Sequence, residues 1–368
     1  MLHIIGIIIS LFLSTLLFTK KGKSKADGIL AIWLFLIAIH LISYYLRISG
    51  DFFKFPYFLG LEIPMPLFHG PFLYLYTVSL TDTRIRKLHW FFHFIPVILG
   101  YMILSHFFLL SSAEKIQVYQ NQGIGYTTLT TIIRFAILLS GLSYVGMCLL
   151  LLHRHRKNIP ERFSALEKID LNWLTYLIIG LGIIWLSVLF GNDISTFTLV
   201  DIFILFIGYF GVKQVGIFTN KVLPQTAEVV EAQDDPDKIK YQKSSLGEAA
   251  LLEIHGRLQQ LMKEEKLFKD PEIKLTELAQ RLNVHAHALS QVINTMEHRN
   301  FYDYINDQRV DEFKAIVILP ENQRYTLLFL AFEVGFNSKS SFNRNFKKST
   351  GLAPTLYLKQ QKIHLQDL

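Results

Sequence analysis

The chain has 368 residues, of which 51% are hydrophobic, 14% aromatic and 18% charged, against roughly a quarter charged in an ordinary soluble domain. Residues 1–212 hold 26 charged side chains and residues 213–368 hold 41, which excludes a single soluble globule and favours a membrane domain joined to a soluble one. The apolar content excludes a disordered chain, and the single Cys148 excludes an intrachain disulfide and a cysteine-based zinc site.

Seven apolar stretches follow one another in the first half of the chain. Most reach the ~20 residues that a helix needs to cross about 30 Å of hydrocarbon. Helices are expected because a backbone in lipid must satisfy its own hydrogen bonds. The third stretch is the weakest, since it is short and begins among prolines. The stretches are 2–19, 28–46, 66–80, 90–110, 127–152, 171–190 and 196–212. They predict a seven-helix transmembrane bundle over residues 1–212.

Positive charges in the loops predict the orientation of this bundle. The first, third and fifth loops hold 12 Lys and Arg, whereas the second, fourth and sixth hold three. Positive residues prefer the cytoplasmic side, so we expect the N-terminus outside and residue 213 inside, in the inner (cytoplasmic) membrane. A cleaved signal peptide has its charges before the apolar run; here Lys20 and Lys21 come after it.

Five ionisable side chains from five predicted spans fall at a similar depth, in the outer third of the bundle. Such groups are costly in hydrocarbon and usually face an interior, often with a partner. Two interpretations remain open. One is a buried pair of Arg134 and Asp201 that holds the bundle together, and the other is an outward-facing pocket for a small-molecule or lipid ligand. The five are His40, His69, His106, Arg134 and Asp201.

Residues 213–247 are expected to be a linker. They contain Pro224 and Pro236 and an acidic run, Glu228 to Asp237, without Lys or Arg. An acidic segment is repelled by an anionic inner leaflet, so the run is either a spacer that holds the next domain off the membrane or simply a soluble linker.

From residue 248 onwards the pattern becomes helical. Apolar residues at spacings of three and four form a stripe on one face, which could pack inside its own domain or pair with a second copy in a homodimer. Packing within the domain is the commoner outcome. The stripe consists of Leu251, Ile254, Leu258, Leu261 and Phe268.

Two helix-turn-helix units follow, joined by a long helix over 301–318. The first consists of helices over 275–282 and 286–294 with Asn283 in the left-handed turn position. In the second, Thr326 and Ser338 can cap the two helices, and Gly335 supplies the turn.

The last helix of the second unit has two contrasting faces. Phe342 and Phe346, four residues apart, are expected to point inward. Counting 100° per residue, the opposite face carries Ser340, Asn343, Arg344, Lys347 and Lys348. Such a helix suits the major groove of double-stranded DNA. The alternative is a solvated basic face, and the net charge of +4 over residues 238–368 does not decide between them.

Residues ~262–362 resemble the AraC/XylS-type DNA-binding domain, most clearly over Ala331 to Lys348, followed by Gly351 and Pro354. The resemblance implies that Lys339, Ser340, Asn343 and Arg344 approach bases or phosphates, with His287, Ser290 and Gln291 at the matching positions of the first recognition helix. It also implies either a structural role or a phosphate contact for Arg309.

The chain departs from the family pattern in its first recognition helix. His285 stands where a Ser or Thr cap is usual, and residues 285–294 contain no Lys or Arg. We therefore expect the second helix-turn-helix to supply most of the phosphate affinity. The membrane half is similar, in architecture alone, to the membrane-embedded subgroup of these regulators.

Together these observations predict an all-α protein with a transmembrane domain over 1–212, a linker over 213–247 and a DNA-binding domain over 248–368. No catalytic motif, metal site or cofactor motif is found. The predicted function is a membrane-embedded, sequence-specific transcription regulator that couples an external or membrane signal to DNA. The alternatives are a transporter or membrane enzyme with a regulatory soluble module, and a membrane anchor without sensing.

Overall fold

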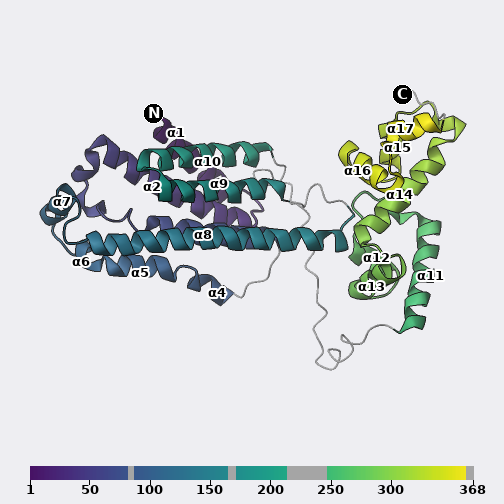
Figure 1. Cartoon of the computed structure of the whole chain (residues 1–368), viewed down its shortest axis with the longest axis horizontal. Helices are drawn as coiled ribbons and strands as arrows, with labels where there is room; N and C mark the ends of the chain where they lie inside the picture. The colour runs from purple at the N-terminus through teal and green to yellow at the C-terminus, as the bar shows by residue number, and fades with distance from the viewer. Residues whose placement is uncertain (82–86, 165–170, 214–246, 362–368) are drawn as a thin grey trace. The chain divides into compact units, whose positions relative to one another are not determined.

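The computed structural model describes residues 1–81, 87–164, 171–213 and 247–361, and the acidic run expected in the linker lies outside them. The chain divides into two compact units. Unit 1 consists of Met1–Arg154 and Leu171–Val230, and unit 2 of His155–Asp170 and Glu231–Leu368. Within the described ranges the regular elements are helices, together with one isolated antiparallel bridge (Figure 1). The all-α prediction is confirmed.

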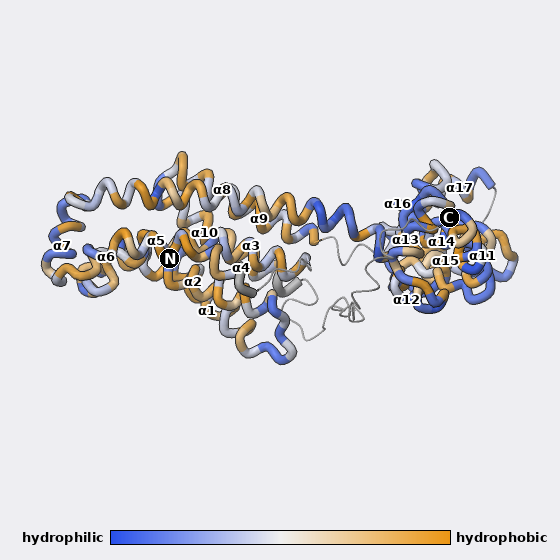
Figure 2. The backbone as a smooth tube through the Cα atoms, turned by 90° about the horizontal axis from the view of Figure 1, so that it is seen from below, coloured by the Kyte–Doolittle hydropathy of each residue, from blue (hydrophilic) through white to orange (hydrophobic). Residues whose placement is uncertain are grey.

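Five helices of unit 1 are long and apolar enough to cross a membrane, counting only the residues that the structure describes. Figure 2 shows them as mainly hydrophobic, with a hydrophilic stretch at the end of α8. Helices α1, α2 and α10 pack together, and α9 packs on α10. The five are α1 (Leu2–Thr19), α2 (Lys25–Ser49), α8 (Thr127–Asn158), α9 (Asn172–Phe190) and α10 (Asp193–Lys213).

The third and fourth predicted spans are shorter than expected. Helix α3 (His69–Leu80) has 12 residues, and the stretch 90–110 is divided among short helices. Pro96 stands in the first turn of α5 and has no N–H to continue a preceding helix. The short helices are α4 (Lys87–Phe92), α5 (Ile95–Ile103) and α6 (Ser105–Phe108). The structure therefore supports five membrane helices rather than the full seven.

Local signals explain where the long helices begin and end. Ser24 accepts a hydrogen bond from the N–H of Asp27, and the Asp27 carboxylate accepts one from the N–H of Ser24, which forms a capping box at the start of α2. Gly50 ends α2 in the left-handed conformation. The outward faces remain apolar: Phe135 and Leu150 of α8 are 69% and 62% exposed. Exposed apolar surface of this extent fits contact with lipid.

Between α2 and α8, short elements connect the spans. Phe52, Leu59 and Phe107 form a small separate core there. The connecting elements are η1 (Asp51–Lys54), η2 (Pro56–Phe58), η3 (Met65–Phe68) and α7 (Ser112–Gln120).

Unit 2 contains two cores that the long helix α14 joins. One surrounds the first helix-turn-helix and includes Leu278 and Leu289; the other surrounds the second and includes Phe313, Phe342 and Phe346. The elements are α11 (Glu248–Glu265), η6 (Leu267–Lys269), α12 (Leu275–Arg281), α13 (Ala286–Met296), α14 (Phe301–Val317), η7 (Pro320–Asn322), α15 (Leu327–Glu333), α16 (Lys339–Thr350) and α17 (Pro354–Gln360).

The apolar stripe on α11 is used inside the domain. Leu251, Ile254 and Leu258 are buried in the first core together with Phe268, and α11 packs on α13. The alternative, in which this stripe pairs with a second copy, is therefore not the arrangement observed.

Both turns have the backbone conformation that their sequences predict. Asn283 has φ of 54° and Gly335 has φ of 101°, in the left-handed region that Asn and Gly tolerate best. A side chain on Gly335 would also collide with the backbone, because an added Cβ would lie 2.5 Å from the carbonyl oxygen of Phe268. Gly335 thus lets the second turn approach the first core closely.

Candidate nucleic-acid interface

Helix α16 presents a polar, basic face on an apolar anchor. Phe342 and Phe346 are fully buried. Ser338 caps the helix, with its Oγ accepting from the N–H of Ser341 at 3.0 Å. The residues of the second helix-turn-helix that the sequence assigned to DNA all lie exposed on this helix: Lys339, Ser340, Asn343, Arg344 and Lys347. A rigid helix that is fixed from behind can keep these side chains in register with base edges.

Three contacts to α14 hold this face in place. Arg344 Nη2 and Asn345 Nδ2 both donate to the hydroxyl of Tyr302, at 3.1 and 2.7 Å. Lys348 Nζ lies 2.6 Å from an Asp303 oxygen, so part of its charge is neutralised within the domain. Arg344 remains exposed, and Lys348 is less available to phosphate than its position on the helical wheel suggests.

The first recognition helix, α13, is placed differently. Its apolar side is fully buried through Leu289, Val292 and Ile293. His287 is exposed, whereas Ser290 and Gln291 are half-buried. His285 occupies the N-cap without a side-chain hydrogen bond, as its departure from the usual Ser or Thr suggests.

A carboxylate that the sequence did not indicate contacts α13. Glu161 Oε2 accepts hydrogen bonds from Ser290 Oγ at 3.3 Å and from Asn294 Nδ2 at 3.2 Å. No local motif marks Glu161, since it lies in the loop after a membrane helix and reaches α13 only through the fold.

Arg309 has a structural role. It is 2% exposed, and its guanidinium donates to the carbonyl oxygens of Phe268 and Asp270, both at 2.7 Å, and to Asn306. Burial lowers its pKa to about 10. Of the two roles that the resemblance left open, a phosphate contact is excluded by this burial.

In unit 1, part of the predicted sensing cluster is brought together. His40 Nδ1 and His69 Nε2 are 3.3 Å apart, and Trp33 Nε1 donates to His69 Nδ1 at 3.2 Å. Asp201 is fully buried, and its Oδ2 lies 2.6 Å from Nδ1 of His3. The predicted pair of Arg134 and Asp201 is therefore wrong, because His3 takes the place of the arginine.

Aromatic rings connect the two halves of this polar set. His3 packs edge-on against Tyr44, and the Tyr44 ring stacks on the Phe197 ring with 3.7 Å between the ring centroids. His40 packs edge-on against the same Phe197. We call these residues the histidine network, namely His3, Trp33, His40, Tyr44, His69, Phe197 and Asp201. His3 went unrecognised, although its place at the outer end of the first predicted span was the available signal.

The other two members of the predicted cluster lie elsewhere. His106 Nδ1 lies 2.6 Å from the hydroxyl of Tyr126 in an exposed position. Arg134 is exposed on α8. Three of the five predicted sensing residues, His40, His69 and Asp201, thus belong to the histidine network.

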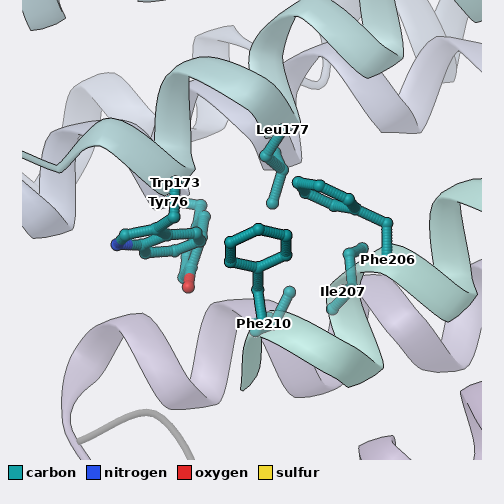
Figure 3. Close-up of a pocket in the computed structure, with 7 residues that line it drawn as sticks. Tyr76, Trp173, Leu177, Phe206, Ile207 and Phe210 are labelled. Carbon is teal, nitrogen blue, oxygen red and sulfur yellow. The ribbon is translucent and has the colours of Figure 1, made fainter. Parts of the chain in front are cut away.

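An apolar cavity in unit 1 is too small for a ligand. Its volume is about 10 Å³, roughly one water, and its lining of aromatic and aliphatic side chains offers few polar partners (Figure 3). It is a packing gap at Tyr76, Trp173 and Phe210.

Comparison with known families identifies the C-terminal region. A family model described as a helix-turn-helix domain matches residues 278–360, from α12 to the end of α17. Comparisons with curated proteins and with solved structures give no match. The C-terminal part of the chain is therefore an AraC-type helix-turn-helix domain, which implies DNA binding, and the five apolar helices that precede it suggest a membrane portion.

Proposed function

We propose that the protein is a membrane-embedded, sequence-specific transcription regulator that binds double-stranded DNA through α13 and α16. The observation that carries this proposal is the exposed face of α16, where Lys339, Arg344 and Lys347 stand beside Ser340 and Asn343 on a helix anchored by buried phenylalanines. Lys and Arg neutralise phosphates, and Arg and Asn can read base edges in the major groove.

Most of the phosphate affinity is assigned to the second helix-turn-helix. Helix α16 carries Lys339, Arg344 and Lys347, besides Lys348 that is paired with Asp303, whereas α13 has neither Lys nor Arg. Each phosphate contact that is lost lowers the slope of log affinity against log salt concentration by about 0.9.

The membrane topology in this proposal holds for five spans as well as for seven. Either number is odd, so either places the end of α10 on the side opposite to the N-terminus. Both also place the lysines that follow α1 and the basic end of α8 on that same side, where positive residues favour the cytoplasm. The DNA-binding domain is then cytoplasmic and meets DNA.

We assign sensing to the histidine network, with a small molecule or a lipid as the ligand. Ionisable groups within a membrane bundle mark functional sites more often than chance, and the network contributes His3, His40, His69 and Asp201. Asp201→Asn should change signal-dependent transcription without weakening DNA binding. Arg134→Ala is the control, since Arg134 lies outside the network, and an unaltered response in Asp201→Asn would leave the network a structural role.

The test of DNA binding uses the full chain in lipid nanodiscs and duplexes selected from a random pool. Arg344→Ala should weaken binding to the selected duplex by about 1–3 kcal/mol if Arg344 reads a base with two hydrogen bonds. Lys263→Ala removes an equal charge from the exposed side of α11 and should have little effect. The assignment to α16 fails if Arg344→Ala binds normally while His287→Ala loses both specific and non-specific binding.

A further inference from the structure

The segment that follows α8 is built into the DNA-binding unit. Unit 2 includes residues 155–164, which are the last four residues of α8 and the described part of the segment after it. Beyond the end of α8, the segment forms the short helix η4 (Ile159–Glu161) and then pairs with the chain before α12 through an antiparallel bridge between Phe163 and Lys274. The N–H of Leu275 donates to the Arg162 carbonyl at 3.1 Å. We call residues 159–164 the docking segment.

Ser164 is buried against α14 in a polar site, which we call the Ser164 site. It is 1% exposed, and its Oγ donates to the carbonyl of Ile273 at 2.8 Å. Asn306 Nδ2 donates to the Ser164 carbonyl at 3.3 Å, and Arg309 Nη2 lies 3.4 Å from Ser164 Oγ. Buried polar groups that satisfy one another's hydrogen bonds specify one geometry. The Ser164 site therefore holds the docking segment by specific hydrogen bonds as well as by apolar contact.

The same segment places a negative charge on the first recognition helix. Glu161 lies against Ser290 and Asn294, and Ser290 is one of the α13 residues assigned to DNA. A phosphate backbone that approaches this turn of α13 meets both the bulk of the segment and its carboxylate. Like charges at close range repel strongly where water is excluded.

We propose that the docking segment is an intramolecular partner of the first helix-turn-helix, and that its docking and DNA binding through α13 exclude each other. The proposal rests on the proposed function, since it requires that α13 meets DNA. In this state α16 remains free to bind DNA, whereas α13 becomes available only when the segment leaves. Because the segment continues directly from α8, the membrane portion has a covalent route to this contact.

The docking segment can reach α13 in the cell whether the protein has five membrane helices or seven. With five membrane helices or with seven, the loop after α8 lies on the same side of the membrane as the chain beyond α10. A partner on the same chain is also present at a high effective concentration, so weak individual contacts suffice for docking.

A reversible disulfide provides the sharpest test. Residues in a non-hydrogen-bonded antiparallel pair have Cα atoms about 4.5 Å apart, within the range that a disulfide spans. Phe163→Cys with Lys274→Cys, in a Cys148→Ala background, should therefore cross-link on oxidation. In full-length protein in nanodiscs, with a random-sequence DNA duplex as the probe, we expect oxidation to weaken binding by about tenfold, which is the loss of one contact of about 1.4 kcal/mol. Reduction should restore the affinity.

One control variant and two further substitutions show whether the cross-link is responsible and which helix is blocked. Phe163→Cys alone should show no change in affinity on oxidation. In the oxidised double-cysteine protein, Gln291→Ala should have no additional effect, because α13 is already excluded, while Arg344→Ala should still weaken binding. Failure to cross-link, or equal affinity in the oxidised and reduced states, overturns the proposal.

The charge of Glu161 allows a second, independent test of the proposal. Glu161→Gln keeps the side chain's size and removes its charge, so DNA binding should tighten severalfold. Glu321→Gln removes an equal charge from the exposed turn η7 and should change the affinity less. Equal effects of the two variants would contradict a local role for Glu161. If the reduced protein and all variants bind no duplex, the proposed function itself fails, and the two failures are thereby distinguished.

Discussion

At the scale of single residues, burial decides between roles that the sequence leaves open. Arg309 stands at a position where the family resemblance allows a phosphate contact or a structural role. In the structure its donors are taken by backbone carbonyls and by Asn306. The enclosed guanidinium links α14 to the backbone at η6 and just after it. Its N–H groups are therefore not available to bind DNA.

Arg309→Met should therefore lower the stability of the DNA-binding domain. Each lost hydrogen bond to a charged group costs about 1.5–3 kcal/mol, and the freed carbonyls stay buried without partners. Limited proteolysis and thermal unfolding of the full chain should show an earlier transition in this domain. The salt dependence of DNA binding by the remaining folded protein should equal that of the unmodified chain, and a smaller slope would show a phosphate contact.

A second residue-scale prediction concerns Glu62, between α2 and η3. Burial raises its pKa, against the hydrogen bond from Tyr119 and the charge of Arg47, which lower it. The folded protein then holds this proton more tightly than the unfolded chain, so stability falls as the pH rises from the ordinary carboxyl pKa through the raised one. Glu62→Gln should remove this decline in thermal unfolding experiments at pH 4 to 8.

Glu114 is the matched control with the opposite sign. The hydrogen bonds from Ser111 lower its pKa, so its contribution is present above the unfolded pKa and is lost as the pH falls through the lowered value. Glu114→Gln should therefore reduce stability at neutral pH and have less effect in acid. The same trend in both variants would contradict the assignment for Glu62.

At the scale of elements, the turns of the two helix-turn-helix units are where sequence and structure agree most closely. Asn283, Thr326, Gly335 and Ser338 each act through neighbours a few residues away. Such signals can be interpreted without knowledge of the fold, which is why the helices of unit 2 begin and end close to their predicted positions. In unit 1 the stretch 90–110 was expected to be continuous, and the proline in the first turn of α5 is the signal that was overlooked.

Gly335→Ala tests the close approach at the second turn. The added Cβ would meet the Phe268 carbonyl and the Lys269 backbone, and the positive φ adds about 1–2 kcal/mol of strain. Gly351 has a similar left-handed backbone but nothing within 4 Å of its Cβ position. Gly351→Ala should therefore cost the strain alone. Equal losses of thermal stability in the two variants would mean that the turn moves away without cost.

At the scale of the whole molecule, the number of spans becomes a measurable question. A topology reporter inserted into loop 82–86 distinguishes the two arrangements, because this loop is cytoplasmic with seven spans and external with five. A reporter fused after Lys221 should be cytoplasmic in both cases. Activity of that fusion only outside the cytoplasm would overturn the orientation itself.

The contacts that could not be predicted are those between distant parts of the chain. Composition and charge indicated a membrane half and a soluble half, because both are summed over many residues. The pairing of His3 with Asp201 and of Glu161 with Ser290 depends on how helices meet. Neither pair shows a local pattern, and the chosen partner of Asp201 was wrong because Arg134 lies on the outer face of α8.

The Ser164 site limits how the DNA-binding domain can be joined to a different membrane domain. Asn306 and Arg309 are satisfied in part by a residue that is encoded more than a hundred positions earlier, between two membrane helices. A hybrid protein that joins only residues 247–368 to a foreign membrane protein would contain Asn306 and Arg309 but would lack Ser164, which hydrogen-bonds to them. The piece that can be transplanted intact therefore consists of two separate stretches of the gene, and exchange at the linker alone divides it.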